Sequence, residues 1–174
     1  MFNQKKNEKK SIVLIGMPGV GKSTIGVILA KEIGYQFVDA DLLIQQQEGM
    51  LLREIIEKKG HDGFLSVENQ VNRDIDAPKS VIATGGSAVY CKEAMEHYKE
   101  TCCVVYLRCP YQVLEKRLGD LKGRGVALKE GQTLWDLYEE RSVLYEKYAD
   151  LIIDEDEKGI EETLEILKSG LENL

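Results

Sequence analysis

A short glycine-rich segment has the residue types and spacing of a phosphate-binding loop. Residues 16–24 read GMPGVGKST directly after the apolar run 12–15 and match the pattern G-x-x-x-x-G-K-[ST]. Glycines carry no Cβ, so the backbone can curl and point successive N–H groups at a phosphate, to which the following helix adds its unpaired N–H groups. Lys22 then places a cation on the β- and γ-phosphates, and the Ser23 hydroxyl suits Mg²⁺. The segment predicts a P-loop that binds nucleotide and Mg²⁺ through these residues: Gly16, Gly19, Val20, Gly21, Lys22, Ser23 and Thr24.

A P-loop by itself leaves a switch, a motor and a kinase open as functional classes. The sequence has no N-K-x-D run, which would mark guanine recognition, and 174 residues is short for a motor domain. The run LIIDE at 151–155 imitates the strand and acid of a Mg²⁺-binding Walker B element. We interpret Asp154 and Glu155 instead as the start of the final helix, where the helix dipole favours acidic side chains. A purely structural turn is the remaining alternative for the loop itself.

Two aspartates, Asp39 and Asp41, stand at the end of the strand-like run YQFVDAD. The carboxyl ends of strands in an α/β sheet face the ligand crevice, which places this pair beside the P-loop. Alternation along an extended segment turns both side chains to the same side. One can help to hold hydrated Mg²⁺ while the other accepts a proton from a substrate hydroxyl, as a small-molecule kinase requires. The alternative is that both only cap the next helix.

Strand-like and helical patterns alternate along the rest of the chain, which predicts a parallel sheet wrapped by helices. The expected strands are 11–16, 35–41, 80–86, 102–107 and 149–154. The expected helices are 23–34, a long stretch within 42–78, 110–118, 132–148 and 158–172. Two segments interrupt this order. We expect residues 42–78 to form a small helical lobe, and residues 119–131, with four glycines among charges, to form a mobile flap.

Composition limits the classes of partner. The formal net charge of −7 and the pI near 5.0 argue against a nucleic-acid partner or a membrane surface. No run approaches the roughly 18 apolar residues that a membrane span needs. Four cysteines without a CxxC pair, beside two histidines, argue against a zinc site and fit a reduced, cytoplasmic protein. We expect a disordered basic tail at 1–10, a single domain at 11–174 and a monomer.

The motifs together resemble the shikimate kinase family of P-loop small-molecule kinases. The likeness runs from about residue 11 through the P-loop, the D-x-D pair, the glycine pair at 85–86, the glycine-rich flap and the segment ERSVLYEKYAD. It implies an α/β, P-loop NTPase-type three-layer fold with a five-stranded parallel sheet, a helical substrate-binding lobe and a mobile lid. It also implies transfer of the γ-phosphate of ATP to the 3-hydroxyl of shikimate, with Mg²⁺.

The resemblance implies a role for each residue at the site of transfer. Lys22 and Ser23 would serve ATP and Mg²⁺, with Asp39 near the metal and Asp41 gripping substrate hydroxyls as the base. Arg124, in the lid, would reach both phosphate and substrate. The catalytic residues would then be Lys22, Asp41 and Arg124.

The remaining matches imply binding contacts. Arg117 matches an arginine that stacks on adenine, and Arg141 matches one that holds the substrate carboxylate. A guanidinium suits both roles because it is planar, always charged and able to fork onto two oxygens. The substrate would further contact the turn after the third strand, formed by Gly85, Gly86 and Ser87.

The sequence departs from the family pattern at three positions. Leu65 stands where the family's F-R-x-x-E motif has an arginine for the shikimate carboxylate, Ser87 stands in place of a third glycine, and Gly125 follows the lid arginine in place of proline. Losing one charge-assisted ligand contact costs about 1.5–3 kcal/mol, roughly ten- to a hundredfold in affinity. Arg53 or Arg73 could substitute if the helix turned. Shikimate remains the leading acceptor, and another small hydroxy acid or polyol is the alternative acceptor. A nucleotide-binding regulatory module without transfer activity is the alternative function.

Overall fold

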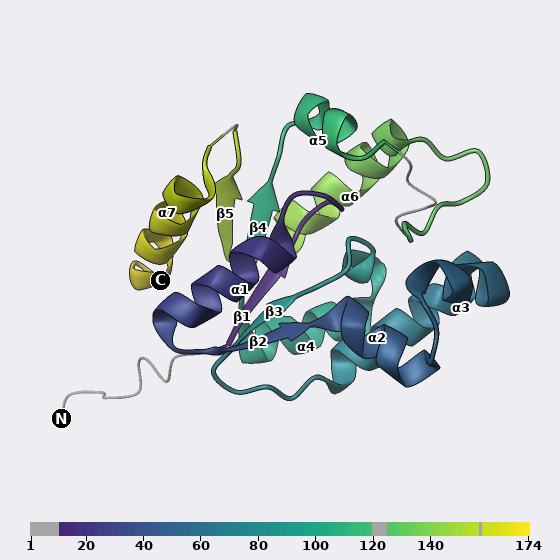
Figure 1. Cartoon of the computed structure of the whole chain (residues 1–174), viewed down its shortest axis with the longest axis horizontal. Coiled ribbons are helices and arrows are strands. Elements are labelled where there is room, and N and C mark those ends of the chain that lie inside the picture. The colour runs from purple at the N-terminus through teal and green to yellow at the C-terminus, as the bar shows by residue number, and fades with distance from the viewer. Residues whose placement is uncertain (1–10, 120–124, 157) are drawn as a thin grey trace.

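The computed structural model describes residues 11–119, 125–156 and 158–174 as an α/β fold around one sheet. The five strands are all parallel and run in the order β2-β3-β1-β4-β5 (Figure 1). Their bounds are β1 Ser11–Ile15, β2 Gln36–Asp39, β3 Ser80–Ala83, β4 Cys102–Arg108 and β5 Leu151–Asp154. The central strands are apolar runs buried on both faces, as a parallel sheet covered by helices requires. All five predicted strands are present.

Helices cover both faces of the sheet. In Figure 1, α1 lies in front of the sheet, while α4 and α6 lie behind it. The helices are α1 Lys22–Ile33, α2 Ala40–Glu48, α3 Leu52–Asp74, α4 Lys92–Thr101, α5 Tyr111–Arg117, α6 Leu134–Tyr148 and α7 Ile160–Glu172, with a 3-10 turn η1 at Ala88–Tyr90. Within the part of the chain described, no helix has the length and apolarity to cross a membrane. The predicted α/β fold class with a five-stranded parallel sheet is confirmed.

Helices α2 and α3 pack into a small second core beside the sheet. Gly49, with φ of 67°, ends α2, and Gly60, with φ of 71°, interrupts α3, so the single stretch expected from the sequence is broken twice. The side chains of this core come from α2, α3 and the segment after residue 124: Ile44, Ile55, Phe64, Val67, Val71 and Ala127. The segment expected to act as a flap therefore contributes to the same core as the lobe.

The sequence analysis missed one helix and misplaced the start of another. Helix α4 was not predicted, although Ala94, Met95 and Tyr98 are buried at helical spacing. The final helix begins at Ile160, so Asp154 does not start it. Asp154 ends β5 and accepts two hydrogen bonds from the Arg108 guanidinium, at 2.5 and 2.9 Å. A bidentate partner on the neighbouring strand accounts for this aspartate without a helix terminus.

Candidate active site

The P-loop is shaped by glycines in the left-handed region of φ. Gly16, Gly19 and Gly21, which connect β1 to α1, have φ of 148°, 78° and 98°. A Cβ on Gly16 would lie 2.7 Å from the carbonyl oxygen of Leu107, so backbone conformation and space both require glycine there. Gly21 is the N-cap of α1 and provides no side-chain cap, so the first N–H groups of the helix remain available to an anion.

Lys22 lies folded back inside this loop. Its side chain is buried, and the Nζ donates hydrogen bonds to the carbonyl oxygens of Gly16, at 2.7 Å, and Met17, at 2.8 Å. Burial lowers the pKa of Lys22 to about 8; the carboxylate of Asp41 opposes this shift, and the charge of Arg141 adds to it. The ammonium is thus held where the loop would receive phosphate, with carbonyl acceptors that carry no full charge.

Ser23 and Asp39 form an oxygen pair at the mouth of the loop. The Ser23 hydroxyl donates to Asp39 Oδ2 at 2.8 Å. Asp39 Oδ1 accepts the N–H groups of Asp41, at 3.0 Å, and Leu42, at 3.2 Å, so Asp39 also caps α2. Hydroxyl and carboxylate oxygens are ligands that Mg²⁺ accepts, and Mg²⁺ commonly takes only one or two protein ligands plus phosphates and waters. The pair therefore fits Mg²⁺. The part of the chain described holds no group of three or more His, Cys, Asp or Glu side chains suited to a metal.

Asp41 lies in the first turn of α2 and not in the strand, so the expected strand alternation is wrong for this residue. The cap made by Asp39 starts the helix immediately after β2. Asp41 lines the cavity, and its Oδ1 is buried without a hydrogen-bond partner among the described residues. Burial and the neighbouring Asp39 raise the pKa of Asp41 to about 6, while Lys22 lowers it. A carboxylate of this kind is suited to accept a proton near neutral pH.

Glu68 is a site residue that we did not predict. It lies on α3, is fully buried, and accepts a hydrogen bond of 2.6 Å from the Ser87 hydroxyl through Oε2. Its Oε1 is buried and has no partner within the described residues. Burial raises the pKa of Glu68 to about 7 against the lowering effect of the Ser87 hydrogen bond. Two signals were available: Glu68 is the glutamate of the F-R-x-x-E motif, and it shares the buried face of α3 with Phe64 and Val71.

The glycine pair after β3 leaves space for these acids. A Cβ on Gly85 would lie 2.6 Å from Glu68 Oε1 and 2.7 Å from Asp41 Oδ1. A Cβ on Gly86 would lie 2.7 Å from Pro18 and 3.0 Å from Arg141 Nη1. Any larger residue at either position would therefore displace groups that line the cavity.

Arg141 reaches the cavity from α6 and is almost fully buried. Its Nη2 donates to the Ala127 carbonyl at 3.2 Å and its Nε to the Tyr90 hydroxyl at 3.4 Å. The guanidinium also lies 5.3 Å from the centre of the Tyr90 ring, within cation–π range. A lone arginine on a helix would ordinarily be a solvated charge, and here burial orients its guanidinium at the site.

Arg117 lies at the edge of the P-loop. At the end of α5, its Nη1 donates to the Gly19 carbonyl at 3.4 Å and lies 3.6 Å from Glu155 Oε2. Burial raises the pKa of Glu155, and Arg117 lowers it. Arg124, the predicted lid arginine, lies outside the described residues.

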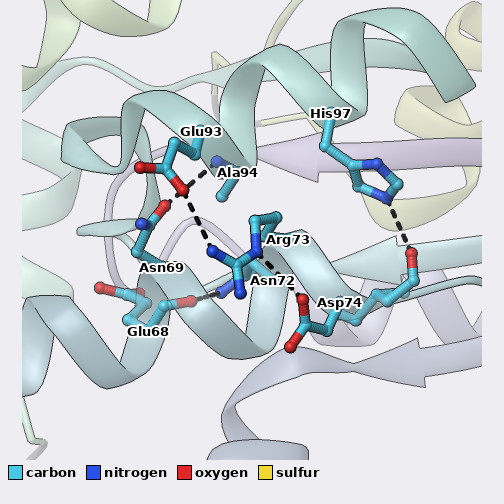
Figure 2. A network of polar contacts seen from close by, with 9 residues as sticks. Glu68, Asn69, Asn72, Arg73, Asp74, Glu93, Ala94 and His97 are labelled. Atoms are coloured by element: carbon cyan, nitrogen blue, oxygen red, sulfur yellow. Dashed lines mark hydrogen bonds and ion pairs between the residues drawn. The ribbon is translucent and has the colours of Figure 1, made fainter.

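The cations suggested as substitutes at Leu65 lie elsewhere. Leu65 is half-buried against the small second core and does not line the cavity. Arg73 is engaged in ion pairs with Asp74 and Glu93, at 3.0 and 3.1 Å, in the network between α3 and α4 shown in Figure 2. Arg53 is exposed and does not line the cavity either. Among the described residues, Lys22 and Arg141 are the cavity's cations.

These groups surround one cavity of about 420 Å³ between the P-loop, the lobe and α6. Glu68 lines it together with ten residues of the predicted site: Gly19, Gly21, Lys22, Ser23, Thr24, Asp41, Gly85, Gly86, Ser87 and Arg141. The two cations, hydroxyl side chains and the glycine-rich loop therefore lie around the two acids in one space.

Comparison with known proteins agrees with this geometry. The family model for shikimate kinase matches residues 18–171. The chain belongs to the shikimate kinase family. Shikimate kinase 2 of Yersinia pseudotuberculosis serotype O:3 (strain YPIII) is 36% identical over 154 residues, which cover 83% of this chain and 86% of that protein. The resemblance inferred from the motifs is confirmed.

Solved structures of this family share the fold. Shikimate kinase from Acinetobacter baumannii in complex with shikimate superposes with a TM-score of 0.85 at 32% identity, covering 94% of each chain. Shikimate kinase from Aquifex aeolicus gives 0.81 at 33% identity, covering 93% of this chain and 96% of its own. As a family member the chain is a kinase that transfers a phosphoryl group from ATP to an alcohol and uses Mg²⁺.

The burial of Glu68 predicts a stability change that depends on pH. Because its pKa is raised from 4.5 to about 7 in the folded state, the stability that Glu68 contributes is present below pH 4.5 and is lost as pH rises through 7. Glu68→Gln removes this titration. We expect the variant to be more stable than the wild type by up to about 3 kcal/mol at pH 8, with a smaller difference at pH 5.

Urea unfolding at both pH values measures this difference. Glu57→Gln, an exposed change on the same helix, serves as the control and should show no pH-dependent difference. A stability difference for Glu68→Gln that is the same at pH 5 and pH 8 would contradict the raised pKa.

Proposed function

We propose that this family member transfers the γ-phosphoryl group of ATP to the 3-hydroxyl of shikimate. The observation that carries the proposal is the cavity itself. It combines a P-loop, Lys22, an unpaired buried acid at Asp41 and a buried arginine at Arg141 in a chain of the shikimate kinase family. A P-loop alone would support nucleotide binding. A base and a carboxylate-binding group in the same cavity support an acidic alcohol as the acceptor.

At the phosphate end, the free N–H groups of the loop and the Lys22 ammonium hold the triphosphate. Lys22 exchanges the carbonyl oxygens of Gly16 and Met17 for phosphate oxygens of higher charge, so little side-chain movement is required. The Ser23 hydroxyl and the Asp39 carboxylate would hold Mg²⁺, which neutralises charge on the β- and γ-phosphates when bound. Arg117 lies where it can flank the nucleotide base.

At the acceptor end, Asp41 takes the proton of the attacking hydroxyl. With a pKa of about 6 it is mostly ionised at neutral pH and is still more basic than an exposed aspartate. Arg141 binds the acceptor carboxylate through its guanidinium, which the Tyr90 ring and the Ala127 carbonyl keep in place. The backbone of Gly85 and Gly86 lets the acceptor approach both groups.

Leu65 favours a second candidate acceptor. Since it lies outside the cavity lining, the acceptor carboxylate meets one arginine, Arg141, among the described residues. This supports either weaker binding of shikimate or preference for another small hydroxy acid or polyol.

A coupled assay of ADP release with shikimate, quinate, gluconate and homoserine tests the substrate assignment. We expect shikimate to give the highest kcat/KM, with a KM raised by roughly tenfold or more over a two-arginine site. ATP alone provides the background rate. Turnover of another acceptor with none of shikimate would refute shikimate and leave the kinase assignment in place.

We further propose that residues 119–131 act as a lid that excludes water and that Arg124 belongs to the catalytic group.

A cytoplasmic monomer fits the acidic composition of the chain. Sedimentation velocity at micromolar concentration tests the monomer, and loss of turnover in Arg124→Ala tests the lid arginine.

A further inference from the structure

Glu68 lines the cavity and has one carboxylate oxygen without a hydrogen-bond partner among the described residues. Its Oε2 is engaged by Ser87, whereas its Oε1 is fully buried and has no partner among the described residues. A buried carboxylate oxygen without a hydrogen bond is costly, so a bound molecule that donates to it gains affinity. A molecule bound in the cavity can supply such a donor, because Glu68 is part of the cavity lining.

The free oxygens of Glu68 and Asp41 are neighbours. Both lie within 2.7 Å of the point where a Cβ on Gly85 would stand. Two acceptor oxygens that flank the same point can each accept a hydrogen bond from one of two adjacent donors on a ligand. Neighbouring hydroxyls of a polyol are such a pair of donors.

Ser87 fixes which oxygen of Glu68 is free. Its hydroxyl donates to Oε2 at 2.6 Å, a short charge-assisted bond that sets the orientation of the carboxylate. The main chain of Glu68 is fixed as well, since Asn72 Nδ2 donates to its carbonyl at 2.8 Å and the Tyr98 hydroxyl donates to Asn72 at 2.7 Å. Figure 2 shows the Glu68–Asn72 bond at the end of the network that joins α3 to α4.

One departure from the family pattern, Ser87 in the glycine turn, contacts this carboxylate directly. The other, Leu65, lies three residues before Glu68 on α3 and carries no charge that could pair with it. Ser87 supplies the hydrogen bond from the opposite wall. Lys22 and Arg141, the cavity's cations among the described residues, donate to carbonyl and hydroxyl groups instead.

We propose that Glu68 binds the acceptor hydroxyl next to the one held by Asp41, and that Ser87 is the residue that positions Glu68 for this contact. The proposal rests on the proposed function, because it assumes an acceptor with two neighbouring hydroxyls. Glu68 is a substrate-binding residue in this account, and Ser87 acts through it.

Steady-state kinetics on shikimate and on its 4-deoxy analogue test the contact. We expect Glu68→Gln to raise the KM for shikimate roughly tenfold with an unchanged KM for ATP, and to change the KM for the deoxy analogue less than twofold. Ser87→Ala should raise the KM for shikimate about three- to tenfold. The double variant should resemble Glu68→Gln alone, because Ser87 acts only through Glu68. Glu57→Gln and Ser66→Ala, both exposed on α3, are the matched controls.

Equal effects on both acceptors, or additive effects of the two substitutions, would overturn the proposal.

If the wild type does not phosphorylate shikimate, the proposed function fails, and the positioning contact is then tested without turnover. Carbon-13 NMR should show a higher pKa for Glu68 in Ser87→Ala than in the wild type, because the Ser87 bond lowers that pKa. The other titratable groups that interact with this carboxylate are unchanged in this comparison: Lys22, Asp41, Cys91, Tyr98 and Arg141. An unaltered pKa would refute the positioning role of Ser87.

Discussion

Lys22→Met is expected to lower phosphoryl transfer by about 10³-fold or more while leaving the chain folded. The Nζ of Lys22 is the buried cation held inside the P-loop, at 2.7 Å from the Gly16 carbonyl. Charge develops on the transferring phosphoryl group during the reaction, and removing a fixed donor or cation at such a position typically costs two to five orders of magnitude. Methionine keeps the length and apolar stem of the side chain without its charge.

The fold should tolerate this change because Lys22 is not a stabilising charge. Burial lowers its pKa from 10.5 to about 8, so the unfolded chain binds this proton more readily than the folded protein does. The free energy of unfolding therefore decreases as pH falls from 10.5 through 8. Removing the ammonium relieves that penalty and loses two hydrogen bonds to carbonyls, effects of opposite sign. We expect the free energy of unfolding at pH 7 to remain within about 1 kcal/mol of the wild type.

Coupled ADP release with saturating shikimate and urea unfolding measure the two properties on the same preparations. Lys31→Met, an exposed change on α1, should alter neither. If Lys22→Met keeps more than a tenth of the wild-type turnover, charge on the phosphates is neutralised by another group and the assigned role of Lys22 is wrong.

The loop and the sheet could be predicted because their signals are local. Nine contiguous residues specify the P-loop, and its glycines have the positive φ values that the pattern demands. Each strand is a short apolar run between turn residues, so five runs predicted five strands. The contact between Ser23 and Asp39 follows from this topology, since β2 ends beside the start of α1.

The acids of the acceptor site depended on contacts that no local pattern reveals. Asp41 was expected on an extended strand, and the hydrogen bonds that Asp39 accepts begin a helix there instead. Glu68 matches the glutamate of the F-R-x-x-E motif, but the motif does not show its burial, which arises only when α3 packs near Gly85 and Ser87. Helix α4 went unrecognised because its apolar positions are few and lie between polar residues.

Asp41→Asn is expected to lower kcat by about 10²- to 10⁴-fold, the usual range for a lost general base. Asparagine keeps the shape of the side chain and can accept a hydrogen bond from the acceptor hydroxyl, but it cannot take its proton. ATP binding should be unchanged, because Lys22 and Ser23 are retained. The result separates an enzyme from a nucleotide-binding module, since a module would have no turnover to lose.

The pH profile supplies a second readout. The base must be ionised to act, so kcat/KM of the wild type should fall as pH drops below about 6, the raised pKa of Asp41. Glu68, whose pKa is about 7, interacts with Asp41, so the two acids titrate as a coupled pair with apparent values that belong to both. In Asp41→Asn the residual kcat/KM should no longer fall as pH drops below about 6.

Asp62→Asn, on an exposed residue of α3, controls for the loss of one negative charge and should leave the profile unchanged. Measurement of kcat/KM from pH 5 to 8 for the three proteins, with ATP affinity by equilibrium dialysis, completes the test. An Asp41→Asn variant with most of its turnover and an unchanged acid limb would exclude Asp41 as the base. Glu68 would then be the remaining buried acid among the described residues that line the cavity, and a loss of kcat rather than of KM in Glu68→Gln would identify it as the proton acceptor.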